Sequence, residues 1–184
     1  MKSTTLLLDD HKRLLLGSGV LTEMAAAAER GHAVNATDLA DLLRFFEEFG
    51  DRHHQGVEEC VLFPALLHDP AQKNYHALCA LVFEHERERS LIDGLHDSLL
   101  TKNTQDFIYC ARRFSEVLRG HIKDEEGALF PLVESTLSSA DDERLEQEMR
   151  AFDKAWQERE LSSQLQRLSE MASRYFTARN ARTA

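Results

Sequence analysis

Apolar residues recur every three or four positions along most of the chain, and no long stretch alternates with a period of two. This spacing predicts α-helices, because residues three and four apart share one face of a helix. Breaks in the pattern separate five predicted helical segments, at about residues 4–30, 37–68, 70–100, 104–137 and 140–175. The first four segments are long and their connections are short. We therefore expect an all-α protein, an antiparallel up-down-up-down four-helix bundle with an additional C-terminal helix.

Local signals support several of the predicted helix ends. Gly31 suits the C-terminal end of the first helix. Thr37 is the predicted N-cap of the second helix, and Asn103 or Thr104 is the predicted N-cap of the fourth. These boundaries define the segments within which the candidate site residues are placed.

The C-terminal part of the chain differs from the rest in its charge. It carries many charged residues and an apolar stripe at helical spacing. We divide the chain into the bundle at 1–138, a C-terminal amphipathic helix at 139–176 and a flexible tail at 177–184. The amphipathic helix is expected to pack on the bundle or to form a homodimer interface.

Charge and composition exclude several classes of function. The 184-residue chain has a formal net charge of −10 and no cluster of Lys and Arg, so we expect neither nucleic acid nor an anionic membrane as a partner. No apolar run approaches the ~20 residues that a membrane span needs, and the short one near the N-terminus does not resemble a signal peptide. The three cysteines form no C-x-x-C motif, which favours reduced thiols in a cytoplasmic protein.

One phrase occurs twice in the chain. Residues 54–64 read HQGVEECVLFP and residues 121–131 read HIKDEEGALFP, so both follow the pattern H-x-x-x-E-E-x-x-L-F-P. The proline near the end of each helix is expected to kink it or to cost a turn. Since residues four apart share one helix face, the first His and the first Glu of each copy point the same way.

These two pairs, His54 with Glu58 and His121 with Glu125, interrupt apolar stripes. A buried His or carboxylate is costly unless it is paired or binds a metal. Either pair alone would be interpreted as an ordinary ion pair on a solvated helix face. The repetition favours a metal site.

The first and third predicted helices each carry one His within an apolar face, His11 and His85. At about 1.5 Å per residue, His85 and the two repeated pairs lie at similar heights in an antiparallel bundle, and His11 lies slightly lower. Four His and two Glu at one level predict a site for two metal ions, with two imidazoles for each ion and bridging carboxylates. Imidazole and carboxylate ligands suit iron, manganese or zinc. Two octahedral ions would keep open positions for water, oxo or a small exogenous ligand.

At these residues the sequence resembles the hemerythrin-like, or HHE cation-binding, family. The resemblance rests on His11, on the two H-x-x-x-E motifs and on E-H-E around His85, and it covers about residues 5–135. It implies a non-haem di-iron centre with an oxo or hydroxo bridge that binds O2, peroxide or nitric oxide.

The sequence departs from the pattern of the oxygen-carrying members of that family. Those proteins have a second His one turn from the first on the third helix, whereas this chain has Leu81 and Arg89 four residues from His85. They also have H-x-x-x-x-D on the fourth helix, where this chain has H-x-x-x-E. The chain is more similar to HHE proteins linked to iron sensing, stress response and iron–sulphur cluster repair.

Four residues beside the predicted ligands need separate interpretations. Glu88, three residues after His85, is a candidate additional ligand. His53 lies about 100° around the helix from His54 and is expected to support the ligands or to lie on the surface. Glu59 and Glu126 are expected to be charges at the surface or at a helix boundary.

The leading hypothesis is a di-iron protein that binds a small diatomic ligand or peroxide, or that senses iron or redox state; no catalytic residue is assigned. One alternative is a di-iron enzyme that acts on peroxide or nitric oxide, or in iron–sulphur cluster repair. A second alternative is a structural zinc-binding protein that interacts with a partner.

Overall fold

The structure is a computed structural model, and it describes residues 1–67, 75–155 and 158–183. Every regular element within these ranges is a helix, as the apolar spacing predicts. The elements are α1 (Lys2–Glu29), α2 (Ala36–Phe45), η1 (Phe46–Gln55), η2 (Glu58–Leu62), α3 (Phe63–Leu67), α4 (Tyr75–Thr101), α5 (Thr104–Asp124), η3 (Glu125–Leu129), α6 (Phe130–Thr136), α7 (Ser139–Ala155) and α8 (Glu158–Thr183). The η elements are π-helical stretches. None of the helices in the described ranges has the length and hydropathy that a membrane span requires.

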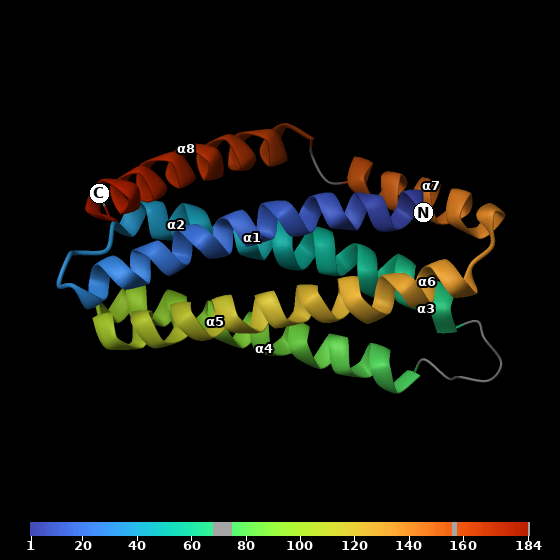
Figure 1. Cartoon of the computed structure of the whole chain (residues 1–184), viewed down its shortest axis with the longest axis horizontal. Coiled ribbons are helices and arrows are strands. Elements are labelled where there is room, and N and C mark those ends of the chain that lie inside the picture. Colours follow the sequence, from blue (N-terminus) through green and yellow to red (C-terminus); the bar gives the residue numbers. More distant parts are fainter. Residues whose placement is uncertain (68–74, 156–157, 184) are drawn as a thin grey trace.

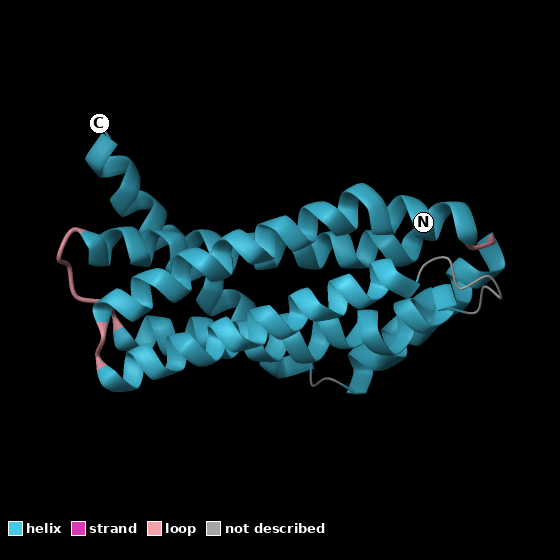
Figure 2. Ribbon diagram, turned by 90° about the horizontal axis from the view of Figure 1, so that it is seen from below, coloured by secondary structure: helices cyan, strands magenta, loops and turns pink. Residues whose placement is uncertain are grey.

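Four long helical segments lie side by side (Figure 1). In that view α1 runs from right to left, the segment from α2 to α3 runs back, α4 runs from right to left again, and the segment from α5 to α6 returns. The most extensive packing joins α4 with α5 and α1 with α5. A view turned by 90° shows the same elongated body (Figure 2).

The C-terminal segment forms two helices where one was expected. Helix α8 packs on α1 and α2, and α7 packs on α1 and η2, so both lie against the body formed by α1 to α6. The segment contains neither Gly nor Pro between residues 140 and 175, so its composition does not signal the division. Helix α8 continues to Thr183, so the expected flexible tail is helical up to that residue.

Helix ends follow side-chain chemistry, with one difference from the prediction. Asn35, and not Thr37, caps α2, because its side chain accepts the backbone N–H groups of the helix's first turn. Asn103 caps α5 in the same way, which is one of the two residues predicted there. Gly31 follows the last turn of α1 with φ +83°, a left-handed conformation that favours glycine.

Each copy of the repeated motif contains a π-helical turn, η2 in the first and η3 in the second. The backbone N–H of Phe63 bonds to the carbonyl of Glu58, and that of Phe130 bonds to the carbonyl of Glu125, five residues back. The next residue is the proline, which has no N–H to donate and would clash with the preceding turn of a regular α-helix. Widening the turn lets the helix continue as α3 and α6, where we expected a kink or a lost turn.

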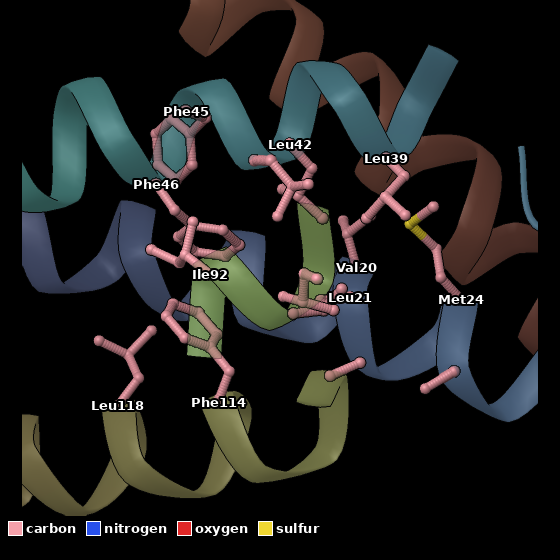
Figure 3. Packing of buried hydrophobic residues seen from close by; sticks show 14 of the residues in the cluster. Val20, Leu21, Met24, Leu39, Leu42, Phe45, Phe46, Ile92, Phe114 and Leu118 are labelled. Carbon is pink, nitrogen blue, oxygen red and sulfur yellow. The ribbon is translucent and has the colours of Figure 1, made fainter. Parts of the chain in front are cut away.

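A polar layer divides the interior into two apolar clusters. The larger cluster includes Leu14 and Leu118, and the smaller one includes Leu7 and Leu129. Along α1 the chain therefore passes from the smaller cluster through His11 to the larger one. Figure 3 shows part of the larger cluster, with side chains from α1, α2, η1, α4 and α5 packed together. The candidate site lies in the polar layer, which every long segment crosses.

Candidate metal centre

The side chains of six residues, each residue exposed by 1% or less, meet in the polar layer. They are His11, His54, Glu58, His85, His121 and Glu125. All four long segments contribute, and these are the residues that the sequence predicts as ligands. His11, which the height estimate placed slightly low, lies with the others.

The donor atoms form two groups, and within each group they lie within 4.8 Å of one another. The first group is His11, His54, Glu58 and Glu125, and the second is Glu58, His85, His121 and Glu125. Both carboxylates belong to both groups. Two adjacent groups of four donors that share two carboxylates can hold two metal ions, with the carboxylates between them.

The distances show how each carboxylate joins the groups. Glu125 Oε2 lies 3.1 Å from His11 Nε2, and its Oε1 lies 3.2 Å from His121 Nε2. Glu58 lies 3.6 Å and 3.5 Å from the Nε2 atoms of the two remaining histidines, one in each group. Every histidine thus turns Nε2 towards a shared carboxylate.

The hydrogen bonds of the histidines fit a metal at the centre. His85 Nδ1 lies 2.7 Å from a carboxylate oxygen of Glu59, and His121 Nδ1 lies 3.0 Å from one of Glu84. Because a carboxylate can only accept, Nδ1 carries the proton, and in the neutral imidazole Nε2 is left with a lone pair. These two Nε2 atoms lie 3.1 Å apart, and neither oxygen of the neighbouring Glu58 makes a hydrogen bond within the described part of the chain. Such a cluster of electron-pair donors suits a cation.

The second glutamate of each motif supports a histidine on a neighbouring helix. Glu59 bonds His85, as above, and Glu126 accepts from His11 Nδ1 at 2.9 Å. Their side chains are 30% and 43% exposed and lie at the start of η2 and η3, as expected for surface or boundary charges, but the prediction missed that each also holds a histidine. A carboxylate on Nδ1 fixes the ring orientation and raises the basicity of the nitrogen that faces a metal.

The phenylalanine of each motif packs on the same histidine as the second glutamate. The Phe63 ring stacks on His85 at 6.2 Å and 13°, and the Phe130 ring stacks on His11 at 5.4 Å and 12°. Each copy of the motif therefore provides one histidine, one shared carboxylate, and both a hydrogen bond and a stacking partner for a histidine on another helix.

In the metal-free centre, protonated histidines pair with the buried carboxylates. Burial alone would lower the pKa of His54, but the Glu58 and Asp10 carboxylates outweigh it and raise that pKa to about 9. Burial likewise opposes the charge on His121, and Glu125 raises the pKa of that ring to about 11. Burial would raise the pKa of Glu125, yet the facing histidines hold it well below the usual range. A metal cation would replace these protons, so its binding should release them.

Comparison with known proteins agrees with this arrangement. Residues 2–133 match the family model described as the hemerythrin HHE cation binding domain. The chain belongs to the hemerythrin HHE cation-binding family. Comparison with curated proteins and with solved structures finds no match for it. The hemerythrin match spans α1 to α5 and most of α6, and leaves α7 and α8 outside.

Two further candidate residues of this hemerythrin-like chain lie beside the centre, outside both donor groups. His53 is buried, with Nε2 3.8 Å from Asp10 and its ring 5.4 Å from that of Phe49, so it does not lie on the surface. Glu88 is also buried, and its Oε2 accepts a hydrogen bond from Gln55 Nε2 at 2.8 Å. Burial raises the pKa of Glu88 to about 7. Gln55 has no counterpart in the second motif, and no sequence signal indicated its role.

Arg89, one of the two residues four positions from His85, pairs with carboxylates beside the centre. Its guanidinium lies 2.7 Å from Asp51 and 3.0 Å from Glu59, the carboxylate that supports His85. A guanidinium keeps its charge and offers no lone pair, so it cannot act as a ligand. The position therefore supports a histidine indirectly.

Proposed function

We propose that this hemerythrin-family chain binds two iron ions, without haem, in the polar layer. The family and the buried donors support a metal site; its occupation by two iron ions is the proposal. The ligands would be His11 and His54 for one ion, His85 and His121 for the other, with Glu58 and Glu125 shared. Bound there, the ions would supply Lewis-acid and redox chemistry.

We also infer that the four long segments form an antiparallel up-down-up-down four-helix bundle, as the path of the chain in Figure 1 supports.

The donor set favours iron over a structural zinc. The two groups offer only imidazole and carboxylate donors, whereas structural zinc sites are closed, four-coordinate and commonly use thiolates. Four protein donors for each ion leave positions open in an octahedral arrangement. A small molecule such as O2, peroxide or nitric oxide would bind there, and the protein would act as a ligand-binding protein or as a sensor of iron or redox state.

The observation that carries the proposal is the inward orientation of the four Nε2 atoms around two shared carboxylates. The test is metal analysis and the visible spectrum of protein purified with iron. We expect two iron ions per chain in the wild type and about one or fewer in His121→Ala. His32→Ala, which changes an exposed histidine at the end of α1, should keep both ions. Less than about one iron per chain in the wild type would contradict the proposal, and redox-silent zinc in protein from its native cells would favour the structural alternative.

One observation favours an enzyme as the second candidate. Glu88 is a buried carboxyl group beside the centre, and a residue of this kind can transfer protons. Repeated turnover of peroxide or nitric oxide that is lost in His54→Ala would support an enzyme. Binding without turnover would reject it.

We further propose a cytoplasmic location, since all three cysteines are free.

A further inference from the structure

A small cavity lies against one side of the metal centre. Its volume is about 10 Å³, which is room for about one water molecule. His54 and His121 line it, together with residues of the larger apolar cluster. Figure 3 shows three of these, Ile92, Phe114 and Leu118, close together above α5. The lining also contains the polar side chains of Asp51, Gln55, Glu88 and Arg89.

Glu88 is one of these polar groups in the lining. Its side chain is 3% exposed, and its Oε1 has no hydrogen-bond partner among the described residues. Its Oε2 accepts from Gln55, and the Gln55 carbonyl oxygen in turn accepts from the half-buried Arg89 at 3.4 Å. The Arg89 guanidinium is directed to other carboxylates. Burial outweighs the attraction of the nearby His121 and His85 rings and raises the pKa of Glu88 to about 7. The neutral form of this carboxyl group can donate a hydrogen bond.

The internal repeat of the site shows that this polar group is an exception. His11 and His85 occupy matching places, since each donates a hydrogen bond to the second glutamate of one copy of the motif and stacks on the phenylalanine of that copy. The residue three positions after His11 is Leu14, and the residue three positions after His85 is Glu88. Both line the cavity. One half of the site is thus apolar where the other half places a carboxyl group.

We propose that Glu88 is the hydrogen-bond donor of a ligand pocket on this side of the centre. It would select small anionic ligands with a lone pair on the terminal atom, such as hydroperoxide or azide, over neutral diatomic molecules. Gln55 positions its carboxyl group. The inference rests on the proposed function, because the ligand would occupy an open position of the two-metal centre.

The test measures the affinities of the iron-loaded protein for two probes, azide and nitric oxide. Each affinity is obtained by an optical titration. Glu88→Leu, which matches Leu14, should weaken azide binding by about tenfold or more, the effect of losing one hydrogen bond to a charged group. It should change nitric oxide affinity by no more than about twofold, since a neutral ligand gains little from that bond. Glu88→Gln keeps an N–H donor and should restore azide affinity to within about threefold of the wild type. Glu116→Leu makes the same change at an exposed site on α5 and should leave both affinities unaltered.

Iron content and circular dichroism of each variant are measured first. If Glu88→Leu does not fold, Glu88→Met replaces it, because Met adapts to irregular spaces. Unchanged azide affinity, or equal losses for azide and nitric oxide, would overturn the inference. So would the loss of one iron ion from Glu88→Leu, which would make Glu88 a metal ligand. A wild type that binds neither probe would refute the proposed function itself, whereas a wild type that binds both, with no effect of Glu88→Leu, would refute only the role of Glu88.

Discussion

The substitution Glu88→Gln should change how the stability of the metal-free protein depends on pH. Glutamine has nearly the same shape, and its carbonyl can still accept the hydrogen bond from Gln55. It removes only the ability to ionise. Any pH-dependent difference between wild type and variant therefore reports the charge on one buried carboxyl group.

Both the sign and the size of the effect follow from the shifted pKa. Burial raises the pKa of Glu88 from 4.5 to about 7, so the folded protein holds this proton more tightly than the unfolded chain does. As the pH rises from about 4.5 to above 7, the unfolded chain releases the proton first and the wild type loses stability. At 1.36 kcal/mol per pH unit, the loss amounts to about 3 kcal/mol, and it is complete near pH 8. The variant Glu88→Gln does not show this loss of stability, because its side chain cannot ionise.

Urea unfolding of chelator-treated protein between pH 4.5 and pH 8 measures this difference. We expect the stability of the variant relative to wild type to increase by about 3 kcal/mol across that range. Titrations of groups that do not interact with Glu88 occur in both proteins and cancel in the comparison. The response of His121, His85 and His54 to the Glu88 charge is part of the measured difference. Glu116→Gln, at an exposed site, controls for loss of a glutamate as such. A difference that stays constant with pH would refute the argument, since Glu88 would then ionise in the folded protein as it does in the unfolded chain.

Three further predictions concern packing, capping and the support of the histidines. Gly17→Ala should destabilise the protein by about 1–2 kcal/mol in urea unfolding, because the new Cβ would lie 3.0–3.2 Å from atoms of two buried phenylalanine rings. Gly120→Ala, with open space around it, should stabilise the protein by about 1 kcal/mol. Asp142→Ala should cost about 1–2 kcal/mol in thermal unfolding, because its carboxylate accepts two backbone N–H groups at the start of α1, and Glu143→Ala on the same helix should have little effect. Glu126→Ala should weaken metal binding by about tenfold or more in a competition with a chelator, since it removes the hydrogen-bond acceptor that orients His11. Unchanged affinity would show that this bond does not support the site.

The fold class and the six central donors could be predicted because both follow from helical periodicity. A His and a Glu four residues apart share a face, and this holds whatever the neighbouring helices do. The relative heights were harder to obtain. They depend on where each helix begins and on how far it slides along its neighbour, and an error of two residues already moves a side chain by about 3 Å. His11 was placed slightly low for this reason.

Contacts between helices could not be predicted in the same way. Glu59 follows Glu58 directly, so a helical wheel turns it away from the centre by about 100°. Its carboxylate nevertheless reaches His85 on another helix, which depends on the spacing of the two helices. The repeat did contain a signal, since both copies of the motif have a second glutamate. The pair of Glu88 and Gln55 is not repeated. Glu88 was a candidate because it follows His85 by three residues, but no pattern in the chain indicated its contact with Gln55.

The repeat and its exception have different consequences for function. Matching residues around the two halves of the centre give each metal position a similar set of donors, which fixes where metal ions would bind but does not discriminate between ligands. Discrimination requires a group that lies on one side only. Glu88 opposite Leu14 is such a group, and Arg89, four residues after His85, supports the same side where the matching residue of α1 is Leu15. The residues that break the repeat are therefore where ligand preference should change by substitution without loss of the metal.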